Sequence, residues 1–390
     1  MSITTAKGFR AAGVTAGLKK SGNPDLALVV NDGPQKNAAA VFTSNRVAAA
    51  PVHWSRQVLG DGRVDAVLLN SGGANACTGP EGFQNTHTTA EKTADVLGIS
   101  ATDVAVCSTG LIGEQLPMDK MLPGIEAAAA ALASDGGAAA AAAIMTTDTV
   151  SKQAVWTSAP SEEGAASYSI GGMAKGAGML APGLATMLVV ITTDAVVEPE
   201  GLDAALRDAV RVSFNRADSD GCMSTNDTVL LLASGASEVY PDMAEFTTGL
   251  TEVCNTLARA LIADAEGASH EIAITTLNAA SEKDAEVVGR AVARSNLFKT
   301  AIFGNDPNWG RVLASVGTTD AVFDPDQINV SINGVQICRN GGIGDSRDLV
   351  DLKPREVTVE IDLKSGDARA TIWTNDLTHA YVEENSAYSS

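Results

Sequence analysis

The chain has 390 residues, of which 45% are hydrophobic and 19% charged, as expected for a globular protein that forms two domains or one elaborated domain. Its 27 basic and 47 acidic residues give a formal charge of −20, which argues against nucleic acid and anionic membranes as partners but not against an anionic small substrate. No apolar stretch reaches the ~18 residues of a membrane helix, and the N-terminus lacks the apolar core of a signal peptide, so we expect a cytoplasmic protein. Five scattered cysteines without a CxxC pair indicate reduced thiols, and four histidines without metal spacing make a zinc site unexpected.

In the first half of the chain, short apolar runs alternate with helix-forming segments. The apolar runs predict strands at 26–31, 64–69 and 104–106, and 38–42 and 51–54 are candidates for further sheet. The helix-forming segments are 83–97, which Gly98 can cap, and the alanine-rich 127–131 and 138–143. The glycine-rich residues 70–77 predict a turn or a substrate-side loop, and 158–167 predict an exposed loop or hairpin tip.

In the second half, the bend at Pro182-Gly183 precedes a buried strand over 187–191. Further patterns predict a helix over 199–214, a strand over 229–233, a helix through 253–261, a helix capped by Ser281, and a hairpin formed by 357–363 and 368–374. The polar loop 218–227 lacks the spacing of a calcium-binding EF-hand. Together these elements predict an α/β protein with mixed sheets layered with helices, in two lobes.

Thr186 stands where the loop becomes the strand, within KGAGMLAPGLATMLVVITTD at Lys175–Asp194. A hydroxyl held there can attack the carbonyl of Ala185. An N-to-O acyl shift followed by hydrolysis would then cut the chain and give Thr186 a free α-amine. That amine titrates near ~8 and can act as general base for the adjacent hydroxyl. The same pattern also fits an uncut loop that enters a core strand.

Several motifs make the chain resemble the self-cleaving glutamate N-acetyltransferase family of arginine biosynthesis, also called ornithine acetyltransferase. Lys175-Gly176-Ala177-Gly178-Met179 resembles its K-G-x-G-M segment, and Ala185-Thr186-Met187-Leu188 resembles its A-T-M-L cleavage site. Further segments resemble the family's S-T-G, M-T-T-D, D-A-E-G, D-P-N-W-G-R and C-terminal N-S-x-Y-x-T/S motifs, at 108–110, 145–148, 264–267, 306–311 and 385–390. One departure is Gly221-Cys222-Met223, which interrupts the family's acidic loop and leaves a substrate contact from that loop in doubt.

The resemblance implies a role for each matching residue. Thr186 is the nucleophile, at the start of a buried strand, and Thr109 and Gly110 form the oxyanion hole. Lys175 holds the α-carboxylate of the substrate. The remaining substrate-binding residues are Thr146, for which Thr147 is the alternative, and Glu266, Asn385 and Ser390. The run Asn305–Arg311 is expected to be a structural corner beneath the site.

The implied reaction moves the acetyl group of N2-acetylornithine to glutamate through an acetyl-threonine ester, without a cofactor or metal. Cleavage would give chains 1–185 and 186–390 that stay associated, as a heterotetramer with two copies of each. Acetyl-CoA remains open as a second donor, with little activity expected because Gly171–Gly178 lacks the Walker pattern of a nucleotide loop. The alternatives are an N-terminal-nucleophile hydrolase such as an aminopeptidase, and a small-molecule binding protein whose chain stays uncut.

Overall fold

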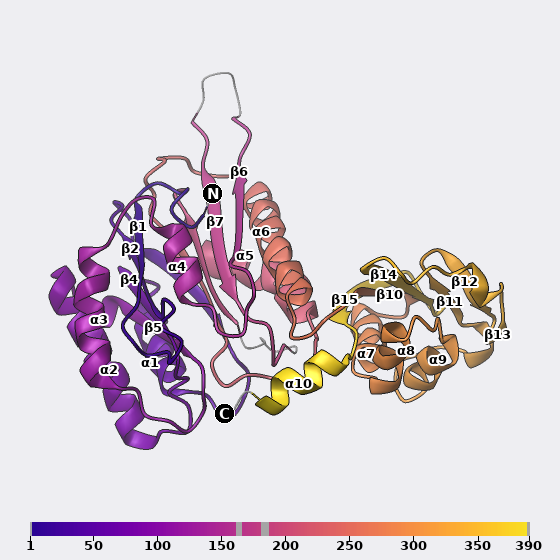
Figure 1. Cartoon of the computed structure of the whole chain (residues 1–390). Coiled ribbons are helices and arrows are strands. Elements are labelled where there is room, and N and C mark those ends of the chain that lie inside the picture. Colours follow the sequence, from indigo (N-terminus) through magenta and orange to yellow (C-terminus); the bar gives the residue numbers. More distant parts are fainter. Residues whose placement is uncertain (1, 161–165, 181–186, 388–390) are drawn as a thin grey trace. The chain divides into compact units, whose positions relative to one another are not determined.

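The computed structural model describes residues 2–160, 166–180 and 187–387 (Figure 1). These residues form two compact units, which we describe separately. The first unit is made of described residues within Met1–Ala177, Gly183–Asn215 and Met223–Leu261. The second is made of those within Gly178–Pro182, Arg216–Cys222 and Ile262–Ser390.

One sheet of the first unit has four strands in the order β1-β2-β4-β5, with β4 and β5 parallel and the other neighbours antiparallel. All side chains of β2, β4 and β5 are buried, which explains why these strands appear in the sequence as continuous apolar runs. The strands are β1 (Phe9–Val14), β2 (Leu26–Asn31), β4 (Ala66–Ser71) and β5 (Val104–Thr109). The helices that pack on this sheet are α1 (Ala50–Val58), α2 (Gly79–Leu97), α3 (Met118–Ala130) and α4 (Gly137–Ala143).

The other sheet of the first unit has five strands in the order β3-β9-β8-β7-β6, with β8 and β9 parallel. Its strands are β3 (Asn37–Phe42), β6 (Lys152–Thr157), β7 (Ser169–Lys175), β8 (Leu188–Thr193) and β9 (Thr228–Ala233). Helix α5 (Pro199–Val212) packs on β3, and α6 (Met243–Ala263) lies along β6 and β7 (Figure 1), where Gly172 leaves room for Leu257. Buried side chains from both sheets form one hydrophobic core.

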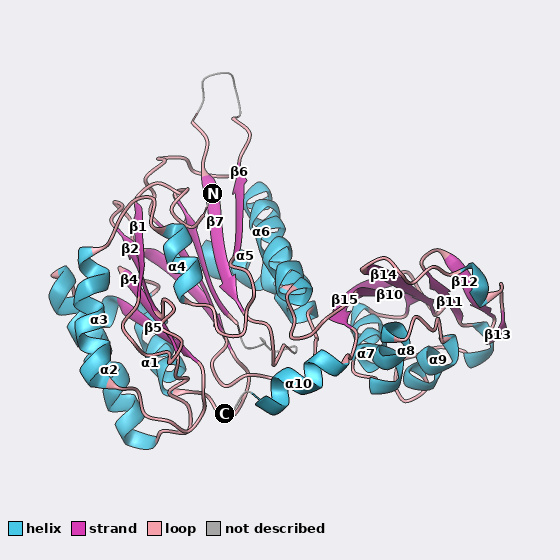
Figure 2. Cartoon of the chain, in the orientation of Figure 1, coloured by secondary structure: helices cyan, strands magenta, loops and turns pink. Residues whose placement is uncertain are grey.

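The second unit is a six-stranded mixed sheet in the order β13-β12-β11-β14-β10-β15, with helices packed on it (Figure 2). Its strands are β10 (Glu271–Ala279), β11 (Asn329–Ile332), β12 (Val335–Arg339), β13 (Gly342–Ile343), β14 (Glu356–Asp362) and β15 (Ala368–Asn375). Its helices are α7 (Glu282–Ala293), α8 (Asn296–Phe303), α9 (Trp309–Val316) and α10 (His379–Ala387). Short 3-10 turns occur along the chain at Leu59–Asp61, Ala101–Asp103, Phe214–Arg216, Pro325–Gln327 and Arg347–Leu349.

The predicted α/β class is confirmed, and most predicted elements lie within a few residues of their observed positions. Gly98 caps α2 with φ +70°, and the Ser281 side chain accepts a hydrogen bond from the Asp284 N–H at the start of α7. Residues 304–308 connect α8 to α9, the Asn308 side chain caps α9, and Trp309–Arg311 form its first turn. The predicted position of the run Asn305–Arg311 beneath the site stays a prediction. Strands β6 and β7 are antiparallel neighbours, so their connection is a hairpin loop, and its residues 161–165 lie outside the described part of the chain. Within the described residues, no helix is both long and apolar enough to cross a membrane.

The prediction of sheet at Pro51–Trp54 is wrong, because these residues belong to α1. Pro51 lies in the first turn of this helix, where the missing N–H removes no hydrogen bond. Val52 and Ser55 are three residues apart and both buried, and the Ser55 hydroxyl donates to the Val106 carbonyl of β5 at 2.8 Å. A short apolar run fits either a strand or a helix by periodicity alone, and here the contacts with β5 decide.

The predicted hairpin of 357–363 and 368–374 is also wrong in its pairing, although both strands exist. Strand β10 lies between β14 and β15, parallel to the first and antiparallel to the second. Ile274 of β10, for example, is in register with Val359 on one side and Ile372 on the other. The turn between β14 and β15 therefore reverses the chain direction and also passes over the end of β10. The two strands that it joins are about 10 Å apart. Local turn signals predict the reversal but not the strand that inserts.

Candidate active site

The predicted oxyanion turn lies at the end of β5, where Thr109 is the last residue of the strand. Gly110 has φ +134°, and a Cβ there would lie 2.5 Å from the Gly73 nitrogen, so the position requires glycine. The N–H groups of Gly72 and Gly73 each donate to the Thr109 carbonyl at 3.0 Å. The glycine-rich loop 70–77 therefore supports the turn that carries Thr109 and Gly110.

Lys175 is the last residue of β7, and its side chain is buried with 1% relative exposure. Its Nζ donates to Thr109 Oγ1 at 3.1 Å, so two predicted site residues from different sheets are in contact. Because an ammonium can only donate, the Thr109 hydroxyl is the acceptor in this bond and keeps its own hydrogen for another group. Lys175 is also the register partner of Leu188, the first residue of β8.

Asp148 joins this contact to the predicted substrate residue Thr146. One carboxylate oxygen accepts from Lys152 Nζ at 2.6 Å and from the Gly176 N–H at 2.7 Å, and the other accepts from the Thr146 N–H at 2.9 Å. The sequence motifs gave Asp148 no role of its own. An acidic residue two positions after Thr146 was the available signal, but the cluster becomes visible only when β7 is placed beside it.

Opposing effects act on the charge of Asp148 in this cluster. Burial opposes ionisation of Asp148, but the Lys175 and Lys152 ammonium groups and the Gly176 N–H hold its pKa at about 2. A second buried carboxyl near Lys175, that of Asp227, has a pKa raised well above its ordinary value, chiefly by burial. The Lys175 and Lys152 ammonium groups therefore both act on the Asp148 carboxylate. A buried lysine beside the predicted oxyanion turn is suited to an anionic group such as a substrate carboxylate.

Asn226 and Asp227 end the polar loop that the sequence analysis left in doubt as a substrate contact. Both side chains are buried. The Asn226 amide donates to the Ser108 and Ala74 carbonyls at 2.8 and 2.6 Å, and Asp227 Oδ1 accepts from the Met187 N–H at 3.1 Å. These contacts join the pair to the predicted oxyanion turn and to the beginning of the strand after Thr186.

In the second unit, Glu266 contacts two other segments that the sequence analysis had singled out. Asn385 Nδ2, on α10, donates to Glu266 Oε2 at 2.9 Å. A Cβ at Gly178 would lie 2.6 Å from the same oxygen, so the carboxylate lies against Gly178 of the same unit. The predicted residues Glu266 and Asn385 are thus brought together, and their contact with substrate stays a prediction.

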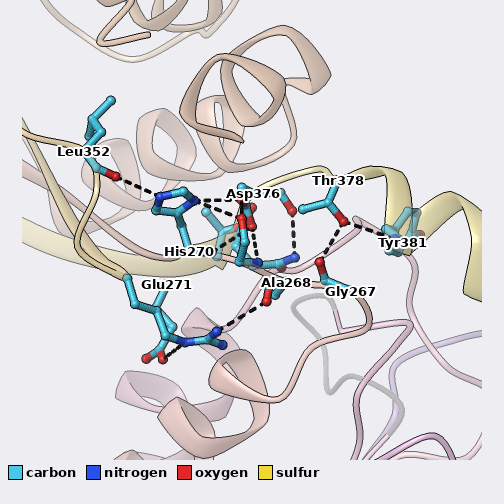
Figure 3. A network of polar contacts seen from close by, with 12 residues as sticks. Gly267, Ala268, His270, Glu271, Leu352, Asp376, Thr378 and Tyr381 are labelled. Carbon is cyan, nitrogen blue, oxygen red and sulfur yellow. Dashed lines mark hydrogen bonds and ion pairs between the residues drawn. The ribbon is translucent and has the colours of Figure 1, made fainter. Parts of the chain in front are cut away.

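A polar network positions the turn that carries Glu266 (Figure 3). Gly267 has φ +64°, and a Cβ there would lie 2.3 Å from the Tyr381 nitrogen, so α10 packs directly on this turn. The Thr378 hydroxyl donates to the Gly267 carbonyl at 2.7 Å and accepts from the Tyr381 N–H at 3.1 Å. The Asp376 carboxylate accepts from the His270 N–H at 2.9 Å and lies 2.8 Å from His270 Nδ1, which ties the end of β15 to the start of β10.

Three predicted residues lie outside the described part of the chain: Ala185 and Thr186 at the proposed cleavage site, and Ser390. The strand predicted after Thr186 is confirmed as β8, and all of its residues are buried. Met187, which precedes β8, is also buried.

Comparison with known proteins identifies the family. A model of the ArgJ family matches residues 10–390. The arginine biosynthesis bifunctional protein ArgJ of Streptomyces coelicolor is 66% identical over 390 residues, which cover 100% of both chains. The protein of the same name from Thermobifida fusca is 63% identical over 389 residues, again 100% of both. A solved chain of the ornithine acetyltransferase of Mycobacterium tuberculosis, complexed with ornithine, is 51% identical, covers 48% of this chain and 96% of its own, and has a TM-score of 0.43.

These matches define the class of protein as an acetyltransferase of arginine biosynthesis that acts on small molecules. The chain belongs to the ArgJ family. The resemblance drawn from the sequence motifs is therefore confirmed, and so is the predicted glutamate N-acetyltransferase activity.

The charge cluster makes a prediction for stability. Asp148→Asn should destabilise the protein at neutral pH, because two buried ammonium groups lose their shared carboxylate. The folded pKa of about 2 lies below the ordinary 3.8, so this stabilisation is present above pH 3.8 and is lost as the pH falls toward 2. Its size corresponds to about 2 kcal/mol. In scanning fluorimetry, the difference in melting temperature between wild type and variant should be largest above about pH 5 and shrink toward pH 3.

The matched control is Asp32→Asn, because Asp32 pairs with Arg10 where both side chains are about two-fifths exposed. An exposed ion pair contributes about 0–1 kcal/mol, so this change should shift the melting temperature little. If the difference for Asp148→Asn stays constant down to pH 3, the assigned charge state of Asp148 is wrong.

Proposed function

We propose that the protein transfers the acetyl group of N2-acetyl-L-ornithine to L-glutamate through an acetyl ester on Thr186. The observation that carries the proposal is the buried contact between Lys175 and Thr109, described above. Lys175 is in register with Leu188, two positions after Thr186 in the sequence. The Lys175 ammonium and the Thr109 hydroxyl therefore lie near the beginning of β8, the strand that follows Thr186 in the sequence.

The first step of the proposal is maturation. The Thr186 hydroxyl adds to the Ala185 carbonyl, the peptide C–N bond breaks, and an ester and a free amine form. Water then hydrolyses the ester to the Ala185 carboxylate and restores the hydroxyl. The fragments would be 1–185 and 186–390. Their association is supported by the five-stranded sheet, in which β3, β6 and β7 come from the first and β8 and β9 from the second.

The second step is acetyl transfer. The Thr186 hydroxyl gives its proton to its own α-amine and attacks the acetyl carbonyl of acetylornithine, and ornithine leaves as an amine. The amine of glutamate then attacks the acetyl ester, which yields N-acetylglutamate and free Thr186. Thr109 and Gly110 would donate to the oxyanion in both half-reactions. The acetyl amide of acetylornithine is broken and that of N-acetylglutamate forms, so the transfer needs no ATP.

Each substrate presents an α-carboxylate, and the buried position of Lys175 in contact with Thr109 supports this lysine as the binding residue. Thr146 is held by the Asp148 carboxylate, which supports its role beside Lys175. Glu266, Asn385 and Ser390 are proposed to bind substrate on the basis of the family resemblance. The heterotetramer and the cytosolic location stay predictions. Acetyl-CoA as a second donor agrees with the word "bifunctional" in the names of the relatives, and we still expect little activity with it.

The maturation step predicts the behaviour of two variants. Thr186→Ala should remain one chain near 39.8 kDa without transferase activity, because the same oxygen cuts the chain and later carries the acetyl group. Thr186→Ser keeps a hydroxyl and should still be cut. Intact-mass spectrometry of protein purified with protease inhibitors measures both. Complete cleavage of Thr186→Ala under these conditions would refute self-processing.

The oxyanion assignment predicts a contrast at Thr109. Thr109→Val keeps the side-chain shape and removes the hydroxyl, so kcat should fall by about 10²–10³, as for other oxyanion donors. Thr109→Ser keeps the hydroxyl and should recover most of this loss. Equal rates for both variants would show that the hydroxyl is not an oxyanion donor. Melting temperatures check that each variant is folded.

The covalent relay predicts ping-pong kinetics. Initial rates against acetylornithine at several fixed glutamate concentrations should give parallel double-reciprocal lines. With acetylornithine alone, the fragment that begins at Thr186 should gain about 42 Da. Intersecting lines without an adduct would exclude the relay. Rapid release of acetate without glutamate would favour the hydrolase instead.

A further inference from the structure

We propose that Asn226 and Asp227 are a positioning pair that fixes the oxyanion turn and the residue after Thr186 relative to each other. The inference rests on the proposed function, because it concerns the geometry between the nucleophile and the oxyanion donors. The pair would act in both self-cleavage and acetyl transfer, through the backbone groups that it holds and without touching the substrate.

Asn226 holds the oxyanion side. Its amide donates to the carbonyl of Ser108, which directly precedes Thr109, at 2.8 Å, and to the carbonyl of Ala74 at 2.6 Å. Its Oδ1 accepts from the Thr225 hydroxyl at 2.6 Å. Three hydrogen bonds in a buried environment leave the amide little freedom. Asn226 therefore ties the end of β5 to the glycine-rich loop behind it.

Asp227 holds the nucleophile side. Its Oδ1 accepts from the N–H of Met187, the residue after Thr186, at 3.1 Å. The Met187 carbonyl accepts from the N–H of Thr228 at 3.2 Å, so two consecutive residues fix both polar groups of Met187. The Asp227 carbonyl accepts from the Thr43 N–H at 2.9 Å, which anchors this residue to the end of β3.

The side chain at 227 provides an acceptor that does not need a negative charge. Burial raises the pKa of Asp227 well above its ordinary value, although the Met187 N–H and the Lys175 charge act in the opposite direction. The Asp227 carboxyl accepts from the Met187 N–H through Oδ1, a role that does not require a negative charge. An asparagine has the same shape and the same kind of acceptor, so it should replace Asp227 in this role.

The pair is adjacent in sequence, and this is what makes it a positioning device. A displacement of the oxyanion turn would be transmitted to Met187 through the single peptide group that joins Asn226 to Asp227. Misplacing reacting groups by about 1 Å can cost about 10²-fold in rate, which is more than the loss of one ordinary hydrogen bond would suggest. A residue that served stability alone would lower the melting temperature without this loss in rate.

The test compares variants of two aspartates, Asp227, which contacts Met187 before β8, and Asp194, which follows β8. Asp227→Ala should slow self-cleavage and lower kcat for acetyl transfer by about 10–100-fold, with a smaller change in KM. Asp227→Asn should recover most of both rates. The matched control is Asp194→Ala, because Asp194 is a buried aspartate after the other end of β8, where it accepts from the Ser169 and Lys7 N–H groups at 2.7 and 3.0 Å. This control should lower the melting temperature while leaving the cleavage rate and kcat near wild type.

Asn226→Ala is the second variant and should lower kcat even if Asp227→Ala does not fold. Cleavage is followed by intact mass after expression, and transfer is measured on the fraction that has been cut. The inference is overturned if Asp227→Ala and Asn226→Ala lose no more rate than Asp194→Ala. It is also overturned if Asp227→Asn is as slow as Asp227→Ala, because Asp227 would then act through its ionisable group. Self-cleavage of Thr186→Ala would instead refute the proposed function, independently of the results for the Asp227 variants.

Discussion

The site in the first unit depends on one buried cation. Lys175 is almost fully buried, and burying an ammonium is costly unless carboxylates and hydrogen-bond acceptors surround it. Thr109 Oγ1 supplies an acceptor, and the nearby Asp148 carboxylate supplies part of the compensating charge. The end of β7, the end of β5 and the segment with Thr146 therefore converge on this lysine. The backbone turns around it, including that of Gly110, follow from the need to bring these groups together.

The two sheets of the first unit explain how such a site can survive a break in the chain. Strand β8 lies inside its sheet, with β7 on one side and β9 on the other. A cut before Met187 would separate β7 from β8 in sequence, but their register, from Ile170 with Thr193 to Lys175 with Leu188, would still hold them together. The apolar core shared by the sheets adds a second barrier to dissociation. On the proposed mechanism, a new α-amine forms without loss of the surrounding geometry.

Much of the fold could be predicted from the sequence, because buried strands such as β2, β4 and β9 are short apolar runs between turns. Sequence could not place strand β10 between β14 and β15, since pairing between distant segments is decided by packing and not by local turn chemistry. At the candidate site, the motifs pointed to Thr109, Gly110 and Lys175, whose roles stay predictions. They did not identify Asp148, Asn226 or Asp227, whose partners lie in other segments of the chain. A polar side chain that supports backbone groups has no sequence pattern of its own.

The two buried aspartates connect the architecture to the chemistry. The Lys175 and Lys152 charges and the Gly176 N–H lower the pKa of Asp148 against the effect of burial, whereas burial raises the pKa of Asp227 above its ordinary value. The charge of Lys175 acts on both carboxyls, one beside Thr146 and the other at the Met187 N–H. Lys175 is thus a buried cation in a chain whose formal charge is −20. On the proposed mechanism, acetylornithine and glutamate share the α-carboxylate that this charge would bind, so one pocket can serve both half-reactions in turn.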